Sequence, residues 1–425
     1  MSNLPICISH PTLTLEISSL FRQGRALTLS TKKEHIVFKM EQYMTTHGDV
    51  YYKLRQEINK MPIPYPETKS GVELRLLMHL FTPAEAEIAL NLNILPETLD
   101  RIHKRVQKSG ITITRKELED VLDNLLKKGA IMGTRLSEAK GKEKQYSLAQ
   151  LVIGMFEFQV DRLTKDFAED FEQYTNEQFH KDLLSIQTKQ MRTIPISRSV
   201  TPDLRVELYN DIREYVKNLK GVIAVQNCVC RQSAEITDNP CRYSDIRETC
   251  LMFSGVARFS VERGMGRLIT KEEALAILDR AEEAGFILQP ENTQKPKFIC
   301  CCCIDCCHAL KVYKMHPKPA DLFISNYYAR VDPSLCKGCE MCIDRCGMGA
   351  ISMEDNVAVI NRDRCIGCGV CVAACVNNAN RMHKKDKTYT PPKTHEDMYK
   401  KIMIERFGLV KTLKIVSRVL TGRKV

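Results

Sequence analysis

Two cysteine-rich runs decide how the C-terminal part of this chain folds. The first, CKGCEMCIDRC, covers residues 336–346, and the second, CIGCGVCVAAC, covers residues 365–375. Each run has the spacing C-x-x-C-x-x-C-x-x-x-C. Three cysteines at intervals of three can wrap one corner of a small inorganic core from a single tight loop, while a fourth thiolate must come from elsewhere. The stretch from Leu335 to Asn380 therefore predicts two metal centres held by thiolates.

The spacing of these runs indicates iron–sulfur clusters. A pair of zinc knuckles is the alternative, but zinc needs four ligands at each site and usually takes them from two separated pairs. Residues 335–380 resemble the bacterial dicluster [4Fe-4S] ferredoxins. That family usually has proline after the last cysteine of each run, whereas this chain has Gly347 and Val376. The difference affects local rigidity rather than ligation.

The resemblance implies two [4Fe-4S] clusters and a ligand set for each. Gly338, Gly367 and Gly369 lie inside the runs and suit loops that turn amide N–H groups towards sulfur. In the two-cluster bacterial arrangement, the last cysteine of each run ligates the other cluster. One implied set is Cys336, Cys339, Cys342 and Cys375, and the other is Cys365, Cys368, Cys371 and Cys346.

The cysteine content is unusual for a globular chain. The 425 residues suggest several domains, and 44% hydrophobic with 27% charged residues is ordinary. The first thirty residues have no signal-peptide pattern, and no apolar run is long enough to span a bilayer. We therefore expect a cytoplasmic protein, in which the nineteen cysteines more often hold metal than form disulfides. Because iron–sulfur chemistry suits low oxygen, such a cysteine load fits an anaerobic organism or niche.

The net charge of +11 is concentrated in the tail. Residues 378–425 carry thirteen Lys or Arg and four Asp or Glu, a net charge of +9, so the rest of the chain carries about +2. A basic linker there precedes one predicted amphipathic helix from His395 to Leu420. We expect this helix to dock on an acidic partner or to fold back over the ferredoxin segment. Peripheral contact with an anionic membrane, on its inner face, is the alternative.

The N-terminal third predicts helices followed by a hairpin. Thr82 and Thr114 are predicted N-caps, and Gly129 ends the last helix. This order resembles a winged helix-turn-helix domain. The acidic residues Glu117 and Asp120 lie where a recognition helix meets phosphate, which favours protein docking or a structural role and disfavours a nucleic-acid partner. The predicted helices are 71–81, 82–90, 97–108 and 115–128, and the predicted strands are 130–135 and 145–148.

A long helix is predicted over residues 147–187. Apolar residues, several of them aromatic, recur there at steps of three and four from Ile153 to Tyr174 and give one apolar stripe. We interpret the stripe as packing on neighbouring domains, because it lacks the leucine-rich choices of a coiled coil. A dimer seam is the alternative.

Ten further cysteines lie in residues 196–330 and predict additional metal binding. Strands at 221–226 and 298–299 each lead into cysteines, which suggests an α/β domain with metal at one edge. Asp305 and His308 are expected to hydrogen-bond sulfur, with ligation or proton transfer as alternatives. One or two iron–sulfur clusters, a zinc site and a noncubane cluster stay open. The candidate ligands are Cys228, Cys230, Cys241 and Cys250 for one site, and Cys300, Cys302, Cys303, Cys306 and Cys307 for another.

Cys228 and Cys230 would lie on the same side of an extended chain, so that a strand could offer both thiols to one metal.

The whole chain is predicted to be a multidomain α+β protein. The combination of a winged helix, a cysteine-dense middle and a terminal dicluster segment resembles iron–sulfur proteins of anaerobic bacteria and archaea, a resemblance that implies no particular reaction. The predicted parts are a helical N-terminal segment (1–65), a winged-helix-like domain (66–150), a long connecting helix (151–195), a cysteine-rich α/β domain (196–330), a dicluster ferredoxin domain (331–385), and a basic linker with an amphipathic helix (386–425).

The predicted function is electron transfer by iron–sulfur clusters, to or from a partner oxidoreductase. No acid/base pair, nucleophile or substrate-binding motif in the sequence indicates a stand-alone enzyme. Two alternatives belong to other classes. One is a redox-sensing transcription regulator that acts through the winged helix, and the other is a reductase subunit that uses the middle cysteines.

Overall fold

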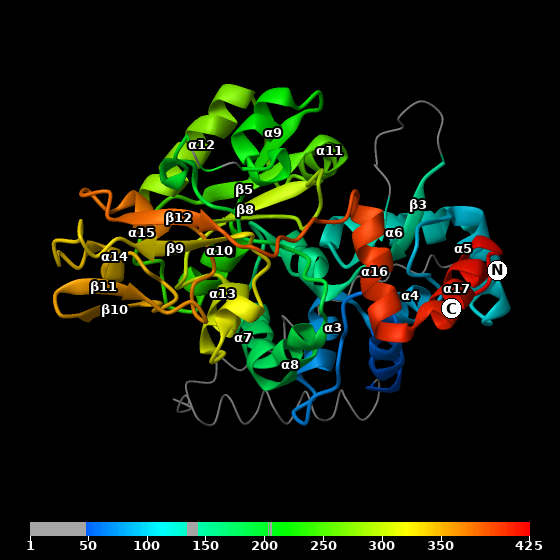
Figure 1. Cartoon of the computed structure of the whole chain (residues 1–425). Helices are drawn as coiled ribbons and strands as arrows, with labels where there is room; N and C mark the ends of the chain where they lie inside the picture. The colour runs from blue at the N-terminus through cyan, green and yellow to red at the C-terminus, as the bar shows by residue number, and fades with distance from the viewer. Residues whose placement is uncertain (1–47, 134–142, 203, 205) are drawn as a thin grey trace, which may run out of the picture. The chain divides into compact units, whose positions relative to one another are not determined.

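The computed structural model describes residues 48–133, 143–202, 204 and 206–425, as Figure 1 shows. Nearly all of them belong to one unit, Val50–Val425. Most of the predicted helical segment 1–65 lies outside the described residues. The part of it that is described, residues 48–65, is helical over 48–58. The other predicted boundaries all fall within this one unit and stay predictions.

Helices followed by a hairpin fill residues 72–148 in the predicted order, except that the predicted helix 97–108 begins with a two-residue strand and is helical only from Leu99. Thr82 and Thr114 each form a capping box, because the threonine hydroxyl accepts from the N–H of Glu85 or Glu117 and that glutamate accepts from the threonine N–H. Gly129, at a φ of 72°, ends the last helix. Strand β3 lies between β1 and β2 in an antiparallel sheet. The elements are α3 Val72–Leu80, α4 Pro83–Ala89, β1 Glu97–Thr98, α5 Leu99–Lys108, α6 Arg115–Lys128, β2 Ile131–Gly133 and β3 Gln145–Leu148.

The single helix predicted over 147–187 is wrong. After β3 the chain makes a distorted turn, η2, in which Ile153 has a φ of 22° and Gly154 a φ of 179°. Thr164 then begins a new helix by accepting from the N–H of Phe167. The apolar stripe is buried as predicted, since Phe171 and Tyr174 are buried. The periodicity of apolar residues does not, however, reveal where the helix is interrupted. The segments are η2 Leu151–Met155, η3 Glu157–Gln159, α7 Lys165–Tyr174, η4 Thr175–Phe179 and α8 His180–Ser185.

The middle of the chain forms a five-stranded sheet in the order β6-β4-β5-β8-β7. All of its strand pairs are antiparallel, so the prediction of an α/β domain is corrected to an α+β arrangement. The chain reverses direction between neighbouring strands, and no pair needs the crossover that parallel strands require. The strands are β4 Ile223–Asn227, β5 Glu248–Phe253, β6 Arg267–Ile269, β7 Ile287–Pro290 and β8 Phe298–Cys302.

Helices cover this sheet, and a buried core of aliphatic and aromatic side chains joins them to it. Helices α9 and α12 pack together on one side (Figure 1). Two further helices begin at cysteines, because Cys228 is the N-cap of α10 and Cys307 the N-cap of α13. The helices are α9 Ile212–Asn218, α10 Val229–Ile236, α11 Ser254–Glu262, α12 Lys271–Glu283 and α13 His308–Met315.

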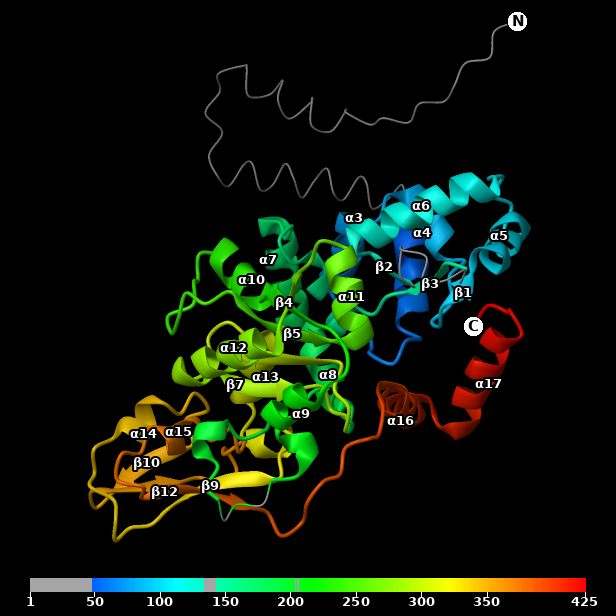
Figure 2. The same ribbon diagram turned by 90° about the horizontal axis from the view of Figure 1, so that it is seen from above.

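The two cysteine runs lie in a separate group of short elements, gathered at one side in Figures 1 and 2. Two antiparallel strand pairs frame two helices of one turn each: β10 and β11 form a hairpin, whereas β9 pairs with β12 from the other end of the segment. Each helix begins within a cysteine run, after a residue of positive φ, Glu340 or Gly369. The elements are β9 Tyr327–Val331, α14 Met341–Asp344, β10 Ile351–Glu354, β11 Val357–Ile360, α15 Val370–Ala373 and β12 Asn380–Lys384.

The tail contains two helices where one was predicted. Gly408, at a φ of 75°, separates α16 His395–Phe407 from α17 Leu409–Leu420. The end of the chain contacts the N-terminal elements, since the Lys60 ammonium donates to the Val425 carbonyl (2.9 Å) and the Asn93 amide to the Arg423 carbonyl (3.2 Å). The tail therefore folds back, but onto this region rather than over the ferredoxin segment.

Among the described residues, no helix combines the length and apolar character needed to cross a bilayer.

Candidate metal centres

The first cysteine group is a small pocket lined by Cys336, Cys339, Cys342 and Cys375. Backbone N–H groups point at its sulfurs: Ala358 donates to the Cys336 thiol (3.5 Å) and Asn380 to the Cys375 thiol (3.4 Å). The N–H groups of Ala358 and Gly338 lower the pKa of Cys336. These contacts favour the thiolate, the form that ligates metal.

The second group places Cys346 beside Cys365, Cys368 and Cys371 around another pocket. Ala329 and Ala350 donate backbone N–H groups to the thiols of Cys365 (3.5 Å) and Cys346 (3.3 Å). Burial raises the pKa of Cys368 to about 12. This group is enclosed, with Cys365 and Cys371 buried, whereas Cys339 of the first group is exposed.

Both pockets suit a [4Fe-4S] cluster. Each contains the four thiols that such a cluster takes from a protein, the second with Cys303 as a further thiol on its wall, and each supplies amide N–H groups to sulfur. The last cysteine of each run lies with the other run, which is the grouping that the resemblance implies.

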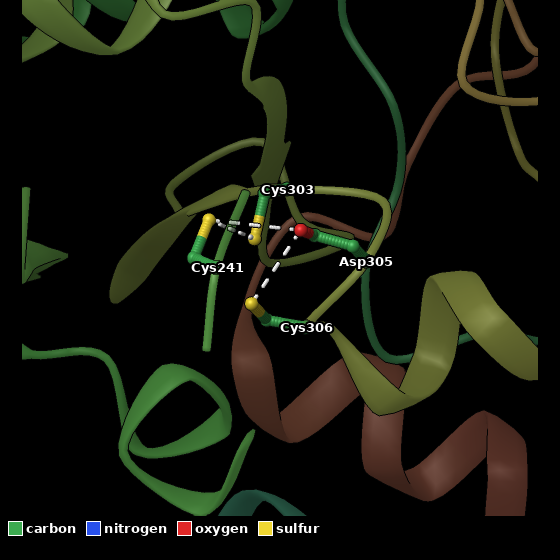
Figure 3. A group of neighbouring side chains, drawn as sticks. All are labelled: Cys241, Cys303, Asp305 and Cys306. Atoms are coloured by element: carbon green, nitrogen blue, oxygen red, sulfur yellow. Dashed lines mark hydrogen bonds between the residues drawn. The ribbon is translucent and has the colours of Figure 1, made fainter. Parts of the chain in front are cut away.

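A third group lies between β8 and α13, where three thiols surround a carboxylate (Figure 3). The ligand atoms of Cys241, Cys303, Asp305 and Cys306 all lie within 4.8 Å of one another. The Asp305 carboxylate accepts from the thiols of Cys241 (3.6 Å) and Cys306 (3.4 Å). The backbone N–H of Arg242 holds its other oxygen at 2.8 Å. Three sulfurs and one oxygen form a donor set that suits zinc or iron.

Arg231 brings a buried positive charge to these thiols. The side chain is 1% exposed, stacks 3.9 Å from the Phe286 ring centroid and donates to the Ile246 carbonyl. Its Nε and Nη2 atoms have no nitrogen or oxygen partner among the described residues. Burial lowers the pKa of Arg231, but neighbouring thiolates, Cys303 foremost, outweigh it and raise the pKa overall. A buried guanidinium with two nitrogen atoms free of nitrogen and oxygen partners in the described part of the chain suits an anionic centre at the thiols.

Six thiols form a fourth group on one wall of a large cavity. Cys250 and Cys300 are register partners on β5 and β8, with their sulfurs 3.4 Å apart. Electrostatic interactions continue the series, because the neighbouring thiols of Cys300 and Cys307 raise the pKa of Cys302. The thiols of Cys228 and Cys307 likewise raise the pKa of Cys230. The six-thiol group consists of Cys228, Cys230, Cys250, Cys300, Cys302 and Cys307.

The structure changes two predictions about these cysteines. Cys228 caps α10 and Cys230 lies in its first turn, so the pair is brought together by a helix start rather than by an extended strand. Cys241 lies with Cys303 and not with Cys228, Cys230 and Cys250, because the loop before β5 carries it towards α13. The remaining cysteine of β8, Cys301, belongs to neither group; it is buried in the core, and burial raises its pKa.

Three polar residues on the cavity wall were not predicted from the sequence. Burial raises the pKa of Glu157 to about 8, and its carboxylate accepts from the N–H of Gly154 (2.7 Å). The Tyr399 hydroxyl accepts from the amides of Gln150 (2.7 Å) and Gln190 (2.9 Å). Gln289 is the register partner of Cys300. In the sequence, the only sign of its role was that it is the polar residue in a buried strand.

Comparison with known protein families identifies the C-terminal part of the site. Residues 328–376 match the family described as the 4Fe-4S dicluster domain. The chain therefore contains a 4Fe-4S dicluster domain within a larger protein, and this domain brings the capacity for iron–sulfur electron transfer. Comparisons with curated proteins and with solved structures gave no match.

Proposed function

We propose that this protein relays electrons between two redox partners through its dicluster domain and through metal centres at the two middle thiol groups. One observation carries the proposal: Cys303 lines both a dicluster pocket and the cavity of the six-thiol group. It lines the pocket of Cys346, Cys365, Cys368 and Cys371, and it also lines the large cavity that bears the six-thiol group. It belongs as well to the Asp305 group.

Close packing supports this continuity. A Cβ atom on Gly347, which follows Cys346, would lie 2.8 Å from the Cβ of Ile304, so the dicluster loop lies directly against the loop that contains Cys303. The Arg345 guanidinium also donates to the Glu283 carbonyl (2.9 Å). Iron–sulfur clusters supply one-electron transfer, and a series of adjacent centres suits a relay.

The chain's own residues hold the thiolates and balance their charge. Amide N–H groups stabilise sulfur in the dicluster domain, and the Arg231 guanidinium provides a buried cation beside Cys303.

The donor partner would dock at the exposed end, where Cys339 is accessible and Val376 is 75% exposed. We assign no DNA-binding role, since Lys144 pairs with Asp123 (2.7 Å) and Glu119 (3.0 Å) of α6, and no contact in the described part of the chain favours nucleic acid.

A matched pair of variants tests the relay. Rapid mixing of the anaerobic protein with a one-electron reductant, followed by freezing and EPR, should show the dicluster signals first and middle-domain signals later. Cys303→Ala should leave the first phase intact and slow the second at least about tenfold, because it removes a thiol at the junction. Cys301→Ala, a buried thiol outside both groups, should change neither phase. Equal rates in the two variants would contradict the proposal.

A further inference from the structure

The cavity beside the six-thiol group is larger than a cluster site requires. Its volume is ≈ 1560 Å³, whereas pockets for small molecules usually measure about 300–1,000 Å³. Its wall runs from β4, β5 and β8 to α16 and α17, and Figures 1 and 2 place α17 well away from the sheet. A cluster on the thiols would fill one part, and most of the remaining wall is apolar.

Near the thiols, the cavity wall carries hydrogen-bonding groups that lack a protein partner. Gln226, Cys250, Cys300 and Gln289 are register partners across four adjacent strands, and all four line the cavity. The Gln226 amide donates to the Ser260 hydroxyl (2.5 Å). The Gln289 amide nitrogen has no hydrogen-bond partner in the described part of the chain, although the residue is only 2% exposed. Such a group calls for an acceptor from a ligand.

His308 adds a second group of this kind. It lines the same cavity, and its Nε2 atom likewise has no partner among the described residues. The ring stands edge-on to Phe156 and Phe171, with centroids 5.5 and 5.0 Å apart. A ring with polar substituents could therefore lie among aromatic side chains at this end, with the Gln289 amide and the His308 ring nitrogen at its edge.

The opposite end of the cavity reaches a helix with exposed apolar residues. Leu409, Leu413 and Val416 of α17 line the cavity and are also exposed to solvent, Leu413 by 55%. They provide an apolar entrance that a long apolar chain can contact. The two ends thus differ in chemistry: polar donors and thiols at one, an apolar entrance at the other.

We propose that the cavity binds a hydrophobic quinone, with its ring carbonyls near Gln289 and His308 and its tail directed towards α17. This inference rests on the proposed relay and names its acceptor. The quinone takes up two electrons and two protons, and its two carbonyl oxygens become hydroxyls. The electrons arrive singly from a reduced one-electron donor protein through the dicluster domain, and the protons come from solvent.

Binding is tested first, on the oxidised, cluster-loaded full chain. A benzoquinone with a decyl tail should bind saturably, and the tail-free benzoquinone at least about tenfold more weakly, because buried methylene groups contribute to affinity. Leu413→Lys should weaken binding of the tailed quinone roughly tenfold, because it places a charge on the apolar wall. Leu420→Lys is the matched control: Leu420 is 68% exposed on the same helix but lies outside the cavity wall, and binding should not change.

Gln289→Leu reports on the ring end. Loss of one N–H donor should weaken both the tailed and the tail-free quinone by the same factor, roughly fivefold. Absence of saturable binding, indifference to the tail, or equal effects of Leu413→Lys and Leu420→Lys would each overturn the inference.

Electron transfer is tested second, by adding the tailed quinone to the reduced protein and following the EPR signals and quinol. The middle-domain signals should disappear as quinol forms. If these signals form but quinone does not reoxidise them, the acceptor assignment is wrong while the relay stands. If the middle domain never becomes reduced, the relay itself is wrong, and the binding titration still decides whether the cavity holds quinone.

Discussion

Gly367 lies between Cys365 and Cys368 at a φ of +71°, and a Cβ atom there would stand 2.2 Å from the Tyr327 carbonyl oxygen. A positive φ costs other residues about 1–2 kcal/mol. The contact adds to this cost because Tyr327 belongs to β9, which is held by its pairing with β12. In the sequence, this glycine was interpreted as suiting a loop that turns amide N–H groups towards sulfur. The approach of β9 depends on the fold and was not predictable from the cysteine spacing.

Gly367→Ala should therefore disrupt the enclosed cluster site. We expect a loss of roughly half of the dicluster iron, because the loop that carries Cys365 and Cys368 must move, and destabilisation by about 3 kcal/mol or more. Iron analysis and anaerobic thermal unfolding measure the two effects.

Gly349→Ala is the matched control for this substitution. Gly349 also has a positive φ, +61°, but a Cβ atom there would meet nothing within 4 Å. It should cost only about 1 kcal/mol and retain iron. Equal iron loss in the two variants would show that backbone strain, and not the approach of β9, determines the effect.

Helix starts were more predictable than helix lengths. Thr82, Thr114 and Gly129 mark helix ends in the sequence and do so in the structure. The two longest predicted helices were both wrong, because Ile153 and Gly408 adopt positive φ values that apolar periodicity does not reveal. The sheet was only partly predicted, since β5, β6 and β7 have weak sequence signals and depend on pairing with their neighbours.

The capping boxes give a prediction for the helical region. Thr114→Ala should destabilise the protein by about 1 kcal/mol, because the N–H of Glu117 loses its acceptor. Thr98→Ala is the comparison, since Thr98 is the N-cap of α5 but its side chain makes no capping hydrogen bond, and it should cost at most about 0.5 kcal/mol. Chemical denaturation of the two variants compares these values. A cost for Thr98→Ala as large as that for Thr114→Ala would contradict the capping assignment.

Across the whole molecule, the sequence identified which cysteines matter better than it identified how they are grouped. In the two terminal runs the cysteines are close in sequence and have a characteristic spacing, so the family resemblance implied their grouping. The middle cysteines come from loops, helix starts and two strands, and only the tertiary structure places Cys241 with Cys303 and Cys250 with Cys300. The cavity and its unpartnered Gln289 left no sequence signal beyond one polar residue in a buried strand.

The central claim is that the middle thiol groups hold iron–sulfur centres in addition to those of the dicluster domain. The most direct test is iron and sulfide analysis of anaerobically purified protein, with EPR of the reduced form. The claim predicts roughly twelve to sixteen irons per chain and signals beyond those of two clusters, with Cys300→Ala and Cys303→Ala each lowering the count but sparing the dicluster signals. About eight irons per chain, unchanged in both variants, would contradict it.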